Sequence, residues 1–265
     1  MFKKYLTLVH LYTINALQYK AYGLVYTLFD LVPTVILLFY WHQAFATTTT
    51  IGAYSHQQLV SYFLVVGLVR IIVISYPEHS LQQQLNSGEF SNFLLKPFSY
   101  VRLAFIGEAT FKINRLINAI PTFALLVLMT TKVLHIRPQL SLSPTLFIIL
   151  ILSFIITFLM KISIGLLAIW TSEISWIVNL NELITLVLSG AALPLSFFPT
   201  WFQTLSHFLP FQFITHIPAL VIENSLTLKD QLVTILTQLV WVSLLGIASQ
   251  AMWQKSLTHY AAYGR

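Results

Sequence analysis

The sequence contains no cysteine, and charged side chains make up only 8% of its 265 residues. Without cysteine, the chain has no disulfide, no thiolate metal site and no cysteine nucleophile. A soluble domain carries roughly 25% charged residues because its surface faces water. Hydrophobic residues are abundant instead, at 57%, and the mean hydropathy is +0.79. This composition excludes an ordinary soluble enzyme and a disordered or fibrous chain, and favours a protein embedded in lipid.

Motifs that would give the chain a chemistry of its own are also missing. The sequence has no G-x-x-x-x-G-K-[ST] phosphate loop, no G-x-S-x-G nucleophile elbow and no H-E-x-x-H zinc helix. None of the eight histidines is paired with another at i, i+4 spacing. We therefore assign no catalytic, cofactor-binding or metal-binding residue. The basic residues form no single stripe, so we expect no nucleic-acid partner.

Six stretches come close to the ~20 apolar residues that a helix needs to cross a bilayer. They are Gly23–Phe45, Leu59–Tyr76, Leu116–Leu134, Leu146–Trp170, Leu183–Phe198 and Leu232–Met252. No segment has the composition of a separate soluble domain. We therefore expect an all-α, polytopic membrane protein in which residues 1–265 form one transmembrane domain.

The fifth stretch is short and breaks at Pro194, and an apolar segment with further prolines follows it as far as Val221. This segment is too interrupted to span and too apolar to be a free loop. We expect one or two short helices that re-enter the outer half of the membrane, which is tolerated where protein buries the broken backbone. The residues that mark this outer hairpin are Pro194, Pro199, Trp201 and Pro210.

The first residues predict a helix that lies along the inner membrane surface and is retained in the protein. Phe2, Tyr5, Leu6 and Val9 share one helical face. No small-residue cleavage site follows, as a secretory signal would require.

The basic residues predict the orientation of the chain. With a cytoplasmic N-terminus, nine of them face the cytoplasm and three face outward, which satisfies the positive-inside rule. The inner nine are Lys3, Lys4, Lys20, Lys96, Arg102, Lys112, Arg115, Lys255 and Arg265, and the outer three are Lys132, Arg137 and Lys229. Both termini are then cytoplasmic.

Charges inside the predicted spans are costly and need partners. Asp30 and Arg70 fall at similar depths in the first two spans, which predicts an ion pair between them. The pair would either lock two neighbouring helices or belong to a substrate path or proton relay. Lys161 has no evident partner at its depth, so we expect it to face a polar cavity.

The longest polar stretch, Glu78–Tyr100, predicts a short amphipathic helix on the cytoplasmic side. Leu85, Phe90 and Phe93 supply its apolar face, and Pro97 ends it. Periodicity leaves two interpretations open: a docking surface for an energy-supplying partner, or a helix resting on lipid.

Three segments together resemble the permeases of type-2 ATP-binding-cassette (ABC) exporters. Residues 85–89 (LNSGE) and 94–98 (LLKPF) resemble the loop after the second span, and Gly190 with residues 193–201 (LPLSFFPTW) and 209–211 (LPF) resembles the outer hairpin. The third segment is the tail at 253–257 (WQKSL), where Ser256 replaces a glycine that is usual in the family. The resemblance covers nearly the whole chain in the same order.

The resemblance implies that the chain is a permease subunit, with no ATPase activity of its own, of a dimeric complex in the bacterial inner membrane. Two cytoplasmic ATPase subunits would bind ATP and Mg, and an identical or homologous permease would complete the path. The loop with Gly88, Glu89, Phe93, Lys96 and Pro97 would be the coupling helix that docks on the ATPase. The outer hairpin would serve as a gate.

The many aromatic residues of the hairpin favour export of an amphipathic or hydrophobic substrate. Two alternatives stay open at this point. An ion-coupled secondary transporter would use Asp30, Arg70 and Lys161. An intramembrane lipid-modifying enzyme would need a convergent catalytic set that the sequence does not offer.

Overall fold

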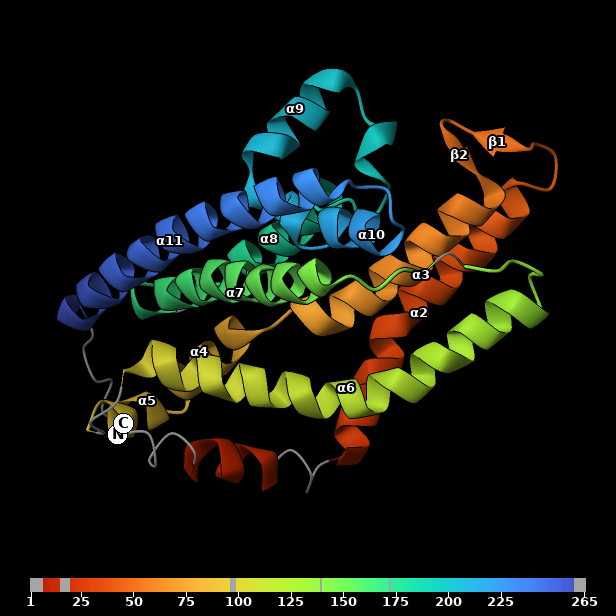
Figure 1. Ribbon diagram of the computed structural model, residues 1–265. Helices are drawn as coiled ribbons and strands as arrows, with labels where there is room; N and C mark the ends of the chain where they lie inside the picture. Colours follow the sequence, from red (N-terminus) through yellow and green to blue (C-terminus); the bar gives the residue numbers. More distant parts are fainter. Residues whose placement is uncertain (1–6, 15–19, 96–98, 139, 172, 260–265) are drawn as a thin grey trace.

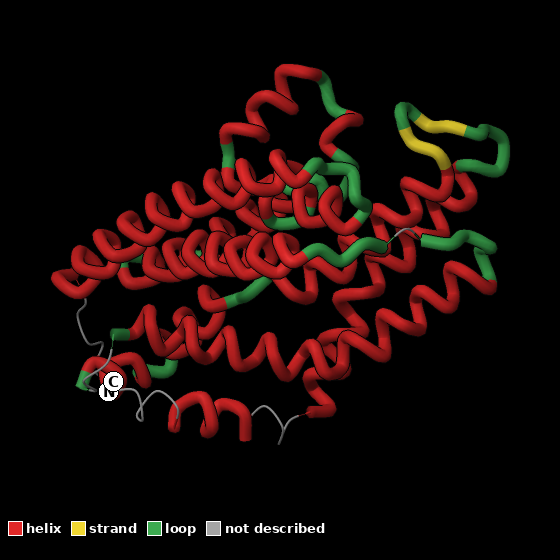
Figure 2. Tube along the Cα trace, in the orientation of Figure 1, coloured by secondary structure: helices red, strands yellow, loops and turns green. Residues whose placement is uncertain are grey.

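The computed structural model describes residues 7–14, 20–95, 99–138, 140–171 and 173–259, and these are mostly helical (Figures 1 and 2). Residues 7–14 form a short helix, and the remaining elements follow in chain order. They are α2 (Lys20–Ala44), β1 (Thr50–Ile51), β2 (Tyr54–Ser55), α3 (His56–Val73), α4 (Pro77–Asn86), α5 (Glu89–Leu94), α6 (Tyr100–Lys132), α7 (Pro144–Leu166), η1 (Leu167–Ile169), α8 (Ser175–Leu188), η2 (Leu195–Phe197), α9 (Thr200–Phe208), η3 (Pro210–Phe213), α10 (His216–Ile222) and α11 (Leu228–His259).

The fold is all-α and polytopic, as the sequence predicts. Five described helices are long and apolar enough to cross a membrane: α2, α3, α6, α7 continued through η1, and α11. Helix α9 and the segment Pro210–Ile222 pass the same test only as a pair, and the two are bent by 78°. The bent pair occupies the segment for which the sequence predicts short helices that re-enter the membrane.

Two predicted spans differ from the observed helices. The third predicted span corresponds to α6, which begins at Tyr100 rather than Leu116. The first half of α6 contains charged residues that lower its hydropathy, but these residues find partners inside the protein. The fifth predicted span corresponds to α8, which runs from Ser175 to Leu188 rather than over residues 183–198. Its 14 residues reach about 21 Å, less than the ~30 Å of a bilayer core.

Local sequence signals explain where several helices begin. Ser55 and Gln58 form a reciprocal capping box at the start of α3. Ser143 caps α7 with its side chain, and Pro144 occupies the first turn, where its missing N–H costs nothing. Residues 7–14 are helical, as predicted for the N-terminal segment, whereas Phe2, Tyr5 and Leu6 lie outside the described residues.

Helix α7 lies at the centre of the bundle and packs most extensively on α11, with α4 and α3 on other sides (Figure 1). One cluster of buried side chains surrounds α3, which is the most enclosed span. A second cluster joins α4, α5, α6, α7 and α11 at one end of the bundle; its fully or nearly fully buried members are Leu81, Phe90, Tyr100, Phe158, Ile162, Leu166 and Trp253. The small β1–β2 hairpin, which the sequence pattern did not predict, lies at the opposite end (Figure 1).

Candidate functional site

Helices α4 and α5 form a helical hairpin whose tip is the turn at Gly88. Pro77 starts α4, and Gly88 has a φ of 76° between the two helices. A side chain at this position would meet nothing within 4 Å, so the left-handed backbone, not space, favours glycine. Gly88 and Glu89 are both exposed at the tip. Of the other residues predicted for this element, Lys96 and Pro97 lie outside the described residues.

The apolar side of the α4–α5 hairpin is covered by other helices of the same chain. Phe90 and Leu81 are fully buried. The ring of Phe90 meets Tyr100 edge-on at 5.4 Å and Trp253 at 6.3 Å, while Tyr100 stacks on Trp253 at 5.9 Å. Phe93 is half-buried and meets Tyr100 edge-on at 4.9 Å. The hairpin is therefore bound to the bundle through its aromatic side, and that side does not rest on lipid.

The opposite side of the hairpin is polar and exposed. Its exposed polar residues are His79, Ser80, Gln83, Asn86, Ser87, Glu89 and Asn92. Leu94 and Leu95 add an apolar edge where α5 ends, and Leu95 is 85% exposed. This combination resembles the rim and anchor pattern of protein interfaces more closely than a lipid-facing surface.

A buried ionic network ties α4 to α7 and α8. Lys161 of α7 donates to Oε1 of Glu78 at 3.2 Å and also pairs with Glu182 of α8. The ammonium lies 4.3 Å from the ring centroid of Tyr76, a cation–π contact. Lys161 thus has two acidic partners, which corrects the prediction of a lone lysine facing a polar cavity. The partners were missed because they lie 83 and 21 positions away in the sequence.

Close backbone packing makes this network possible. A side chain at Gly165 would lie 2.9 Å from the Cα of Glu78, so only glycine lets α4 approach α7 this closely. Burial raises the pKa of Glu78 to about 7, against the opposing effect of the Lys161 charge. Oε2 of Glu78 has no hydrogen-bond partner among the described residues. Its carboxylate is therefore held by Lys161 through one oxygen.

A second set of charges joins α2, α3 and α6. Arg115 of α6 pairs with Asp30 of α2. The Nζ of Lys112 donates to the carbonyls of Ile71, at 3.0 Å, and Ile74, thereby satisfying carbonyls at the C-terminal end of α3.

The prediction of an Asp30–Arg70 pair is wrong, because Asp30 pairs with Arg115 and no described ion pair includes Arg70. The prediction placed Arg115 in a cytoplasmic loop, since the third span was expected to begin at Leu116. With α6 beginning at Tyr100, Arg115 lies well inside the helix and reaches Asp30.

The outer hairpin is anchored to the bundle by hydrogen bonds. The Tyr62 hydroxyl, fully buried in α3, donates to the Gly190 carbonyl at 2.8 Å and lies 3.1 Å from Nδ1 of His216. Thr215 donates to the Ser189 carbonyl at 2.6 Å. These bonds satisfy backbone carbonyls that have no partner within α8 at its C-terminal end.

The prolines of the hairpin stand where its short helices begin. Pro194 and Pro199 immediately precede η2 and α9, and Pro210 is the first residue of η3. Trp201, in α9, is 67% exposed, and α9 projects from the bundle (Figure 1). The hairpin is thus fixed at its base and exposed at α9. Among the described residues, no three histidine or acidic side chains gather as a metal site would require.

The geometry defines a class of protein: a multi-pass helical membrane protein with a helical hairpin at one end and a sharply bent helical segment after the short helix α8. The family model described as "ABC-2 family transporter protein" matches residues 31–264. The chain belongs to this family and is a membrane permease of an ABC transporter. None of the curated proteins matches the chain.

Proposed function

We propose that the chain is the permease subunit of an ABC exporter and that separate ATPase subunits dock on the α4–α5 hairpin. The observation that carries this proposal is the division of the hairpin's surface. Its aromatic side is bound to the chain's own α6, α7 and α11, and its polar tip at Gly88 and Glu89 is left exposed. The partner subunits would bind ATP and Mg, because the permease sequence has no phosphate loop.

In the proposed assembly, two ATPase subunits act on two permease chains, identical or homologous, in the bacterial cytoplasmic membrane. Lys112 and Arg115 lie buried within α6, and the remaining basic residues are distributed seven to three. This distribution supports an orientation with both termini in the cytoplasm. That orientation puts the α4–α5 hairpin on the same side as the ATPases. Movement of the hairpin would reach α7 and α8 through Lys161, which pairs with Glu78 and Glu182.

The proposed cargo is amphipathic or hydrophobic, and the outer hairpin is the proposed gate. Helix α9 exposes Trp201, Leu205 and Phe208, a surface that suits apolar groups. The alternative of an ion-coupled transporter would use Asp30, Arg70 and Lys161, and the structure supports it less well in two of these side chains, Asp30 and Lys161. Both of these side chains have partners of opposite charge within the chain.

Purification of the tagged chain from mild detergent tests the partnership directly. We expect an ATPase with a phosphate loop to copurify, and its basal ATP hydrolysis to rise when the permease is added to it in liposomes. If the tagged chain is purified intact and no such ATPase accompanies it, the proposal is contradicted.

The docking role of the hairpin is tested by Glu89→Lys. We expect this charge reversal to remove most of the permease-dependent stimulation of ATP hydrolysis, because a rim charge governs association with a complementary surface. Glu173→Lys is the matched control, since Glu173 is also exposed but lies between η1 and α8. Equal stimulation by wild type and Glu89→Lys would contradict docking at this tip.

A further inference from the structure

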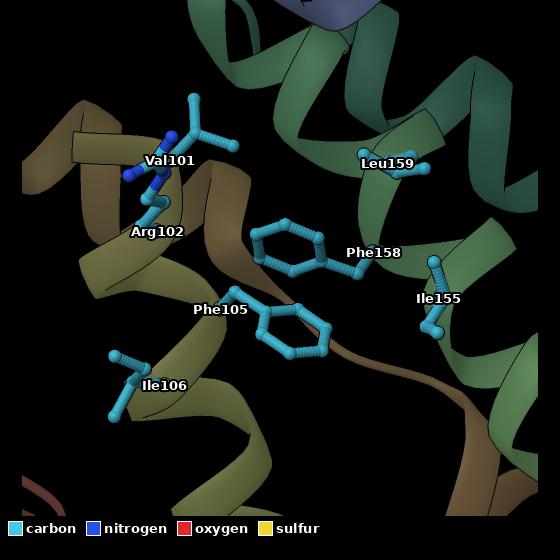
Figure 3. Close-up of a pocket in the computed structure, with 7 residues that line it drawn as sticks. All are labelled: Val101, Arg102, Phe105, Ile106, Ile155, Phe158 and Leu159. Atoms are coloured by element: carbon cyan, nitrogen blue, oxygen red, sulfur yellow. The ribbon is translucent and has the colours of Figure 1, made fainter. Parts of the chain in front are cut away.

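A lateral apolar cavity lies between α6 and α7, near the end of the bundle that bears the α4–α5 hairpin. Its volume is about 350 Å³, within the range of roughly 300–1,000 Å³ typical of ligand sites. It is lined by Val101, Arg102, Phe105, Ile106, Ile155, Phe158 and Leu159 (Figure 3). All but Arg102 are apolar.

The walls of the cavity are built from two helices that pack on other elements. The ring of Phe158 is buried in the cluster that holds α4 and α5, and Phe105 meets it edge-on at 5.2 Å. These two rings lie between the helices (Figure 3). Ile106 and Ile155 lie one turn beyond Arg102 and Leu159, which extends the apolar lining by about 6 Å along the helices.

Arg102 supplies a single positive charge at the mouth of the cavity. It is the third residue of α6, and its guanidinium turns back toward Val101, away from the Phe105 ring (Figure 3). No described residue forms an ion pair with it. An arginine near the end of a membrane helix directs its charged group to the level of the lipid headgroups.

We infer that this cavity binds one anionic phospholipid, with the upper part of an acyl chain between α6 and α7 and the headgroup phosphate on Arg102. Both walls of the cavity belong to membrane-spanning helices, so the molecules that can enter the cavity from its surroundings are lipids. The apolar lining fits a hydrocarbon chain, and the one cation fits one negative headgroup. This inference depends on the membrane location of the chain and not on the proposed docking of an ATPase.

Fluorescence quenching by lipid tests the site, because the natural chain has no cysteine and one introduced cysteine can be labelled alone. A fluorophore at Ile155→Cys reports on the cavity in full-length protein reconstituted with brominated lipids. A fluorophore at Ile247→Cys is the control. Ile247 is 70% exposed on α11, at a comparable distance from the C-terminal end of its helix. The two probe lipids are brominated phosphatidylglycerol and brominated phosphatidylcholine, with bromine at the same chain position.

We expect phosphatidylglycerol to occupy the site next to Ile155 with about fivefold preference, the effect of one basic residue at the membrane surface. At Ile247 the two lipids should quench equally. Arg102→Gln should abolish the preference at Ile155, and Arg102→Lys should retain it. Unchanged quenching at Ile247 shows that each variant is inserted in the membrane. Three results would overturn the inference: equal quenching at Ile155 in the wild type, a preference that survives Arg102→Gln, or no quenching at Ile155 because protein covers the cavity.

Discussion

The α4–α5 hairpin and the outer hairpin are both short, broken helical elements, but they are attached to the bundle differently. The first is joined by a buried ionic network centred on Lys161 and by aromatic packing around Phe90. The second is joined by neutral hydrogen bonds from Tyr62 and Thr215 to backbone carbonyls. No described ion pair holds the outer hairpin.

This difference has a mechanical consequence. Removing one member of a buried ion pair leaves an uncompensated charge, so the attachment of the α4–α5 hairpin depends on every partner. A neutral hydrogen bond contributes only about 1 kcal/mol net, and its loss is felt locally. The α4–α5 hairpin should therefore move together with α7 and α8, whereas the outer hairpin can change its position in smaller steps.

The largest expected effect comes from Lys161→Met. This substitution leaves Glu78 buried without its cation, and we expect it to lower the free energy of unfolding by about 3–5 kcal/mol. Thermal unfolding in detergent micelles measures the effect. Lys255→Met, at an exposed position of α11, should change little. Adding Glu78→Gln to Lys161→Met should recover part of the loss, and a Lys161→Met protein as stable as wild type would refute the ionic attachment.

The charges of α2 and α6 give the next largest effect. We expect Asp30→Asn to destabilise the protein by about 2 kcal/mol, because the buried Arg115 loses its partner. Arg70→Gln should cost less, since no described ion pair includes Arg70. The same unfolding assay compares the two variants. A greater loss with Arg70→Gln than with Asp30→Asn would restore the pairing that the sequence alone predicted.

The outer attachment is tested by Gly190→Ala. Gly190 has a φ of 77°, and a side chain there would lie 2.8 Å from the Tyr62 hydroxyl. The backbone strain alone is about 1–2 kcal/mol, and the displaced hydroxyl adds to it. Gly246→Ala is the control, because this helical glycine has no neighbour within 4 Å and alanine should stabilise it by roughly 0.5–1 kcal/mol. Destabilisation of similar size at both glycines would show that the Tyr62 contact is unimportant.

The sequence predicts the parts of this fold that depend on local pattern. Long apolar runs identified α2, α3, α7 and α11, and the amphipathic period of residues 78–100 indicated a short helical element before the third span. The resemblance read from the 85–98, 190–211 and 253–257 segments agrees with the family match over residues 31–264.

The charged side chains were less predictable, because their partners are far apart in the sequence. Lys161 and Arg115 could be assigned partners only once α4, α8 and α2 were placed around them. Hydropathy also hid the first half of α6, since Lys112 and Arg115 count as polar in a window even though the fold buries them against partners. The aromatic contacts of Phe90 with Tyr100 and Trp253 likewise join three separate helices.

The last expected effect is a slope and not a loss of stability at one pH, and it concerns the attachment of the α4–α5 hairpin. Burial raises the pKa of Glu78 from 4.5 to about 7, so between these values the folded protein holds a proton that the unfolded chain has lost. Stability should therefore fall as the pH rises from about 4.5 to 7. Glu78→Gln should make this part of the curve less steep, as measured by thermal unfolding at a series of pH values. Glu89→Gln, at an exposed site, should leave the slope unchanged. Part of the slope should remain in Glu78→Gln, because burial also raises the pKa of Glu223, beside α10, to about 8. A slope as steep as that of the wild type would show that Glu78 does not contribute to it.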